Sequence, residues 1–244
     1  MTVMANASGK RSARVPTAAG MFFLASCLAA ACSPKPEKPD PADIRAARQA
    51  ALMLEGQLRT QVLARLDRGD DPMAVYTAYR DTVRELTLDA ARKAAAKLGL
   101  VAALPDPPRD PEAPDTPAAP SAASRPEAGF FFKRTADRVR NRANAADDWE
   151  LRQLEGFQYW LDAGMDENTL DVSEVVTEGG RRWFRWMRPI VMSEACMTCH
   201  GEAISDAILT RLGQDYPDDE GTGYAEGDLA GAYSVKIALP DRRR

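Results

Sequence analysis

The chain has 244 residues, with 32 Lys and Arg against 36 Asp and Glu, a formal charge of −4 and a single histidine. Residues 1–31 contain three basic side chains and no acidic one, so the remainder carries a formal charge of −7. An acidic chain of this kind is poorly suited to nucleic acid or to an anionic lipid surface, and we expect no nucleic-acid partner.

Residues 1–31 have the features of a secretory signal peptide. Basic residues precede an apolar run that is too short to span a bilayer. Cys27 and Cys32 each fit a lipoprotein-type cleavage site, and ordinary cleavage after small residues is the alternative. We therefore expect an exported protein, periplasmic or anchored to the inner or outer membrane by a lipid on one of these cysteines, with residues 32–41 as a tether.

The segment 42–100 is predicted to be a helical hairpin. Asp40 and Pro41 form a typical helix start, and Asp71 and Pro72 repeat it. Apolar side chains follow each start at helical spacing. The loop before Asp71 is short, which forces the two helices to be antiparallel neighbours.

Residues 101–128 differ from the segments on either side. They are rich in proline, alanine and charge, a composition that buries too little apolar surface to offset the entropy of ordering. We predict a flexible insertion here, and a short tail over 239–244.

Residues 129–238 are predicted to form a sheet domain. Asp147 and Glu150 fit a capping box before an amphipathic helix. A β-hairpin follows over 172–190, and the alternation over 229–237 predicts a C-terminal strand. The whole chain is therefore expected to be α+β, a long helical hairpin followed by an antiparallel sheet.

Aromatic side chains gather in the predicted hairpin. Trp183, Phe184 and Trp186 lie close together in the sequence, shortly before a cysteine motif. They can be sheet core, or Trp183 and Trp186 can form the wall of a cofactor pocket.

The cysteine motif is Cys196-Met197-Thr198-Cys199-His200, and it contains the only histidine. Cys-x-x-Cys-His is the haem c attachment sequence, in which two thiols bond to haem vinyl groups and the imidazole ligates iron. A redox disulfide normally belongs to a βαβ setting, and a zinc site needs a second ligand pair. Neither is evident here, so the motif predicts one covalent haem per chain.

The sixth iron ligand remains open. A second histidine does not exist, and the other two cysteines lie in the signal or tether. The position can be filled by methionine, tyrosine, lysine, an amine, water or an external ligand. The methionine candidates, each of which can equally be a core side chain, are Met73, Met165, Met187 and Met192.

The second half also contains a series of short motifs: Arg134-Thr135, Arg140-Asn141, Trp149-Glu150, Cys196-x-x-Cys199-His200-Gly201, Tyr216-Pro217-x-Asp219 and Gly223-Tyr224-x-x-Gly227-Asp228. Over 42–100 and 129–238 the chain resembles the haem c-binding PAS-like domain family, long known only as a domain of unknown function. Members occur as lone secreted proteins and as extracytoplasmic input domains of histidine kinases and chemoreceptors. The resemblance implies a PAS-like sheet behind long helices, and a haem-based redox or gas sensor.

One position departs from that family pattern. The resemblance implies an axial cysteine in the N-terminal helices, and Tyr79 stands in its place. Tyr79 is therefore a candidate distal ligand or distal-pocket residue, although it can also simply pack. Arg140 and Asn141 are candidate contacts for a haem propionate, or part of a solvated basic face.

Three function classes follow from these features. The first is a haem module that senses redox state or binds O2, NO or CO and signals to a separate protein. The second is a periplasmic single-haem electron carrier with a redox partner. The third, a peroxidase-like enzyme, would need a distal histidine that the chain lacks, so we expect no enzyme.

Overall fold

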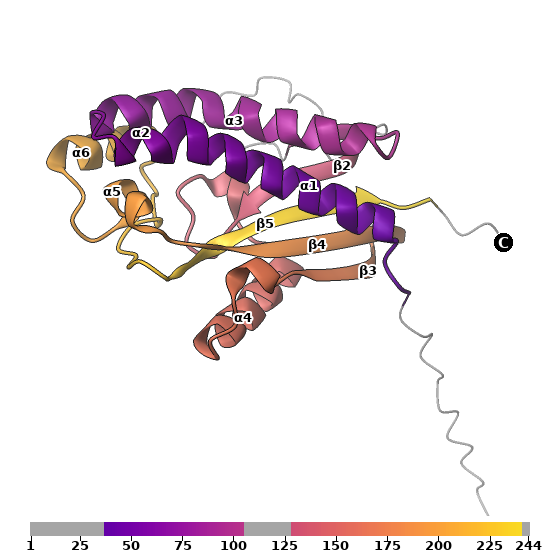
Figure 1. The fold of residues 1–244 in the computed structure, drawn as a ribbon. Helices are drawn as coiled ribbons and strands as arrows, with labels where there is room; N and C mark the ends of the chain where they lie inside the picture. Colours follow the sequence, from indigo (N-terminus) through magenta and orange to yellow (C-terminus); the bar gives the residue numbers. More distant parts are fainter. Residues whose placement is uncertain (1–36, 105–127, 241–244) are drawn as a thin grey trace, which may run out of the picture. The chain divides into compact units, whose positions relative to one another are not determined.

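The computed structural model describes residues 37–104 and 128–240 (Figure 1). The predicted signal peptide, with Cys27 and Cys32, lies outside these residues, as do most of the predicted insertion and tail. The described part is α+β, with one five-stranded sheet and helices on both of its faces. None of its helices is both long enough and apolar enough to cross a bilayer.

The first half of the chain is helical. Helix α1 (Pro41–Leu58) passes directly into a π-helical turn, η1 (Arg59–Leu63), and then into α2 (Ala64–Asp67). Helix α3 (Pro72–Ala96) follows after a short turn. Both starts have the predicted caps: the Asp40 carboxylate accepts from the Ala42 amide at 2.7 Å, and Asp71 accepts from Ala74 at 3.0 Å.

Helices α1 and α3 pack side by side through small residues. Their contact is almost entirely alanine, fully or nearly fully buried. Small side chains let two helix axes approach closely, and they bring the pair down onto the sheet. The alanines of this contact are Ala46, Ala47, Ala50 and Ala51 on α1, and Ala90, Ala91, Ala94 and Ala95 on α3.

The sheet has the strand order β1-β2-β5-β4-β3. Its strands are β1 (Val101–Ala103), β2 (Ala128–Thr135), β3 (Val172–Glu178), β4 (Arg181–Val191) and β5 (Leu229–Ala238). The β3–β4 hairpin and the C-terminal strand are as predicted.

The antiparallel sheet predicted over 129–238 is present, but the complete sheet is not purely antiparallel. Strand β1 pairs with β2 in the parallel direction, so the sheet is mixed. Residues 101–103, predicted as part of the insertion, therefore form a strand. A parallel pair cannot be closed by a tight turn, and β1 and β2 are far enough apart in the sequence, from Ala103 to Ala128, to pair in this direction.

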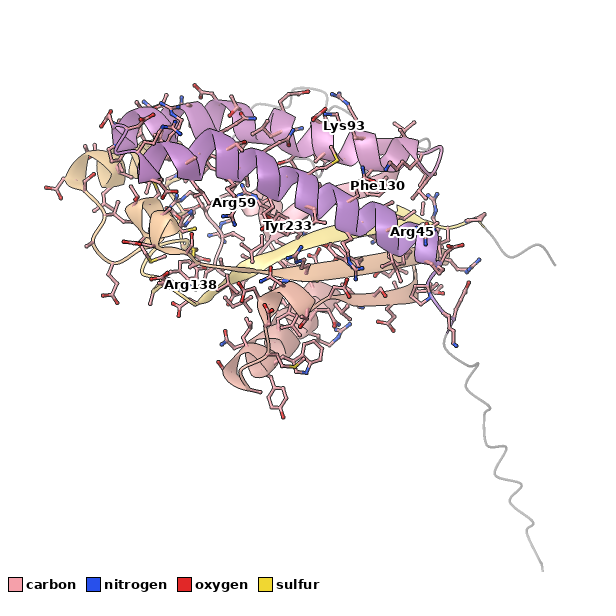
Figure 2. The ribbon with its side chains drawn as sticks, viewed as in Figure 1. Arg45, Arg59, Lys93, Phe130, Arg138 and Tyr233 are labelled. Atoms are coloured by element: carbon pink, nitrogen blue, oxygen red, sulfur yellow. The ribbon has the colours of Figure 1, made fainter. Side chains whose placement is uncertain are left out.

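The sheet face under α1 and α3 changes from apolar to polar along the strands. Side chains on this face form rows across β2, β5 and β4, and two rows are apolar: Phe130, Ile237 and Phe184, then Phe132, Val235 and Trp186. The next row is Arg134, Tyr233 and Arg188. Phe130 and Tyr233 both lie between sheet and helices in Figure 2. The apolar packing thus ends where the polar row begins.

Helix α4 (Asp148–Asp162) packs on the opposite face of the sheet (Figure 1). The predicted capping box is present, because Asp147 accepts from the Glu150 amide and Glu150 accepts from the Asp147 amide, both at 2.9 Å. Glu150 is 1 % exposed and also pairs with Lys133 at 2.8 Å. This face of the sheet is therefore joined to α4 by buried charges as well as by apolar contacts.

Candidate haem site

The cysteine motif forms a short helical stretch beyond the end of β4. Turn η5 (Glu194–Cys196) leads directly into α5 (Met197–His200). Residues three apart in a helix lie on the same side, so Cys196 and Cys199 present their sulfurs to a common region. Both are free thiols, and burial raises the pKa of Cys199, which favours its protonated form.

The backbone turns sharply at Gly201, directly after α5. Its amide donates to the Met197 carbonyl at 3.0 Å. A Cβ at position 201 would lie 2.8 Å from that same carbonyl oxygen, closer than side-chain atoms approach backbone. A glycine is therefore required for this exit from the motif.

The His200 ring is oriented by a backbone carbonyl. Its Nδ1 lies 2.6 Å from the Gly221 oxygen. A carbonyl only accepts, so Nδ1 carries the hydrogen and Nε2 keeps a free lone pair. Burial and the nearby Arg140 guanidinium lower the pKa of His200 to about 4, despite the opposing Gly221 bond. At neutral pH the imidazole is neutral, with Nε2 available as a metal ligand.

Arg140 holds the two segments that frame His200. Its guanidinium pairs with Asp219 at 2.9 Å and donates to the carbonyls of Cys199 at 2.6 Å and Gly221 at 3.3 Å. Both members of the ion pair are largely buried, at 14 % and 10 % exposure. Arg140, a predicted propionate contact, thus positions α5 and the Gly221 loop.

Two cavities open beside the motif. The one we call the β2 cavity has a volume of about 290 Å³ and is bordered by β2, the following loop and α3. The β4 cavity, of about 360 Å³, lies between the end of β4, η1, α2 and α3. Both fall near the lower end of the range for small-molecule sites. The residues that line both are Tyr79, Arg134, Arg140, Ile190, Cys196 and His200.

The β4 cavity is the one that contains the complete motif. Cys196, Cys199 and His200 all line it, whereas Cys199 does not line the β2 cavity. Its helical wall is largely apolar and comes from the region of the π-helical turn, a feature that recurs at functional sites. The apolar residues of that wall are Leu58, Val62, Leu63, Leu66 and Val75.

Tyr79 and Arg134 meet at the border between the two cavities. Tyr79 comes from α3, and Arg134 comes from β2, where it is the cross-strand partner of Tyr233. The Arg134 guanidinium donates to the Tyr79 phenol oxygen and lies 5.5 Å from the centre of its ring. The structure therefore brings the predicted distal residue to the same two cavities as His200.

Other predicted residues lie in different places. Trp186 is fully buried among α1, α3 and the sheet and lines neither cavity, although Arg188, two positions further along β4, lines the β4 cavity. Trp183 points to the other face, where Arg181 and Lys236 lie over its ring. The proposal that these tryptophans form a pocket wall is not supported, because strand alternation and distance separate them from the motif.

Asn141 and the four candidate methionines also differ in position. Asn141 lines the β2 cavity, and its side chain caps a short 3₁₀ turn by accepting from Ala143 at 3.0 Å. Met192 is 7 % exposed and lines the same cavity as His200. Met187 is buried on the α4 face, Met165 is 47 % exposed, Met73 packs against the apolar cluster of α3 and α6 (Asp206–Asp215), and none of the three lines either cavity.

Arg134 and Gly221 are site residues that the sequence reasoning did not single out. Arg134 belonged to a quoted motif, and its alternation with Phe130 and Phe132 places it on the face of β2 toward the helices. Gly221 contributes a backbone oxygen, for which side-chain chemistry provides no signal.

A family model described as Tll0287-like matches residues 58–238, about three quarters of the chain. The chain belongs to the Tll0287-like family. This membership confirms the family resemblance inferred from the motifs, and the matched range includes Tyr79, Arg134 and the whole cysteine motif.

One solved structure is similar to this Tll0287-like protein. It is the crystal structure of the cyanobacterial heme-protein Tll0287, with 18 % identity and a TM-score of 0.48, covering 84 % of this chain and 100 % of that one. The search of curated proteins found no match. The proposals below rest on the residues of this chain.

Proposed function

We propose that this Tll0287-like protein carries one covalent haem c. Cys196 and Cys199 would form the thioether bonds, and His200 Nε2 would be the axial ligand. The observation that carries the proposal is the Nδ1 contact of His200 with the Gly221 carbonyl at 2.6 Å, which leaves Nε2 free beside two free thiols. Bound there, the haem would supply ligand binding at iron and one-electron redox chemistry.

The donor set of the site fits this group. The three motif side chains line one cavity whose helical wall is largely apolar, as suits a porphyrin. Within 37–104 and 128–240, no three or more His, Cys, Asp or Glu side chains are arranged to hold a metal ion. A metal at His200 would therefore have to arrive with its own ligands, as iron does in haem.

The test of haem attachment is production of the full chain in bacteria that have the c-type maturation system. We expect a mass increase equal to one haem and a thioether-type pyridine haemochrome spectrum. Cys196→Ser with Cys199→Ser should lose the covalent haem while Cys27→Ser retains it. Exported protein without covalent haem would refute the proposal.

We further propose that the protein senses redox state or a diatomic gas, O2, NO or CO. Tyr79 and Arg134 support this role, because polar groups on both cavities suit an exchangeable or hydrogen-bonded ligand. The change in redox state or in bound ligand would be transmitted to a separate signalling protein. The chain would act in the periplasm, held there by a lipid on Cys27 or Cys32, and would have no enzymatic activity.

The second candidate is a periplasmic single-haem electron carrier. Met192 favours it, since this buried thioether lines the β2 cavity with His200 and methionine is a common sixth ligand in cytochromes c. The two roles differ in the ferrous state. Rapid binding of carbon monoxide to a high-spin ferrous form supports the sensor. A low-spin ferrous form that does not react with carbon monoxide supports the carrier, provided that Met192→Ala converts it to a reactive form.

Tyr79→Phe tests the distal position. A changed ferric spectrum would mean that the phenol binds iron or the iron's ligand. An unchanged spectrum would mean that Tyr79 only packs.

A further inference from the structure

The β2 cavity is lined by cations without any acidic side chain. No Asp or Glu appears among its lining residues, whereas the β4 cavity includes Glu55 and Glu167. The basic residues that line the β2 cavity are Arg84, Lys133, Arg134, Arg138 and Arg140. A cavity with this lining has a positive potential that attracts anions.

Two of these five cations are already neutralised by the protein. Lys133 pairs with Glu150 at 2.8 Å, and Arg140 pairs with Asp219 at 2.9 Å. Arg138 donates to the Thr222 carbonyl and lies 4.3 Å from the centre of the Tyr224 ring. In Figure 2 it lies at the same end of the sheet as α5. These contacts leave the positive charge of Arg138 uncompensated.

Arg134 is the cation whose position combines burial with the lack of a paired carboxylate. It is half-buried on β2, and in the described part of the chain its hydrogen bond goes to the neutral phenol of Tyr79, with no carboxylate paired to it. Burying a charge without a counter-ion is costly. A guanidinium carries five donors, so its bond to Tyr79 leaves others for a planar anion.

We propose that the β2 cavity is a carboxylate-binding site in which Arg134 is the principal contact. Arg138, and Arg84 from α3, add positive charge at its border. The volume of about 290 Å³ suits a small carboxylate. Two sources share this chemistry: a propionate group of the haem, which would rest on the proposed function, and a free monocarboxylate bound beside it.

The experiment measures binding of sodium propionate by NMR titration to the full chain, purified with haem and, from cells without the maturation system, without haem. Propionamide, the neutral analogue of similar shape, is the control ligand. We expect propionate to bind the haem-free protein, and Arg134→Gln to weaken binding at least tenfold.

Two further variants separate charge loss from misfolding. Arg142→Gln removes a half-exposed arginine outside the cavity lining and should change the affinity less than twofold. Tyr79→Phe removes the phenol oxygen but keeps the guanidinium, so binding should be retained or strengthened. Arg134→Lys should keep part of the binding that Arg134→Gln loses.

The two sources give different results with the haem-containing protein. If haem loading abolishes propionate binding, the haem's own propionate fills the site, and its resonance Raman propionate bands should shift in Arg134→Gln. If propionate still binds, the site takes a free carboxylate. The proposal is overturned if propionate binds neither form better than propionamide and Arg134→Gln leaves the Raman bands unchanged. Haem attachment, measured by mass, tests the proposed function separately.

Discussion

At the scale of single residues, Gly221 contributes only one carbonyl oxygen to the site, yet that atom sets the tautomer of His200 and leaves Nε2 as the available nitrogen. Arg140 secures the arrangement, since it holds both the Gly221 carbonyl and that of Cys199. The imidazole is thus pre-oriented before any cofactor binds.

The first prediction concerns Gly201. In Gly201→Ala, the new Cβ would meet the Met197 carbonyl oxygen at 2.8 Å, so the exit from α5 must shift. We expect a loss of about 1–3 kcal/mol of unfolding free energy, measured by urea denaturation. The yield of covalent haem should fall as well, because the motif and the Gly221 contact would be displaced.

Gly213 provides the matched control. It lies inside α6 (Asp206–Asp215), and a Cβ there would meet nothing within 4 Å. Gly213→Ala should raise stability by about 0.5–1 kcal/mol, since alanine favours helix. Equal effects of the two substitutions would contradict the steric explanation.

At the scale of elements, α6 is joined to α3 by an apolar cluster and by one carboxylate. Asp215 accepts from Tyr76 at 2.8 Å and from Arg80 and Arg211, both at 2.9 Å. Desolvation acts against the charged form, but these three donors outweigh it and lower the pKa of Asp215 to about 2. This contact lies next to the β4 cavity, which Tyr76 lines.

The second prediction is a pH dependence of this contact. Because its pKa is lower in the folded than in the unfolded state, Asp215 stabilises the protein above the unfolded pKa near 4. That contribution, about 2 kcal/mol, should disappear as pH falls from 4 toward 2. The difference in unfolding free energy between wild type and Asp215→Asn should shrink over this range. Asp218→Asn, at an exposed site, should show no such trend.

The elements differ in how well the sequence predicts them. The caps at Asp40, Asp71 and Asp147 were predicted because capping is local, involving residues two or three apart. Strand β1 and helix α6 were not predicted. Three residues are too few for a periodic signal, and β1 depends on pairing with a distant strand.

Strand β2 and part of the site also could not be predicted from the sequence alone. Its run of three phenylalanines does not distinguish strand from helix, because apolar side chains point to both faces. The cysteine motif was found because its chemistry lies within five consecutive residues. The contact of Arg134 with Tyr79 joins residues 55 positions apart, so only the fold reveals it.

At the scale of the whole described unit, the motif and the buried charges lie on opposite faces of the sheet. The motif and the β4 cavity lie with α1 and α3, while α4 covers the other face, which the β2 cavity reaches through Lys133 and Thr135. That second face buries Glu150 and Arg185, which are 1 % and 2 % exposed and lie 3.4 Å apart. Thr135 and Ser234 donate to Glu150 at 3.1 and 2.6 Å.

The third prediction concerns the buried charge of Glu150. Glu150→Gln removes the carboxylate that pairs with Lys133 and one of the three that pair with Arg185, and we expect a loss of about 3 kcal/mol of unfolding free energy. The optical spectrum of the haem protein should not change, because the motif and the β4 cavity lie on the face opposite Glu150. Glu155→Gln, exposed on the same helix, should alter neither property. A shifted haem spectrum in Glu150→Gln would show that the two faces are coupled.

The alanine contact between α1 and α3 should affect how fast backbone amides exchange their hydrogens. Amide hydrogens open for exchange more slowly where packing is dense, so Ala90–Ala95 should exchange slowly with or without haem. The stretch of α3 around Tyr79 lines two cavities instead, and its exchange should slow markedly once haem is attached. Hydrogen–deuterium exchange along α3 would then record haem loading as a gradient that begins at Tyr79 and fades before Ala90.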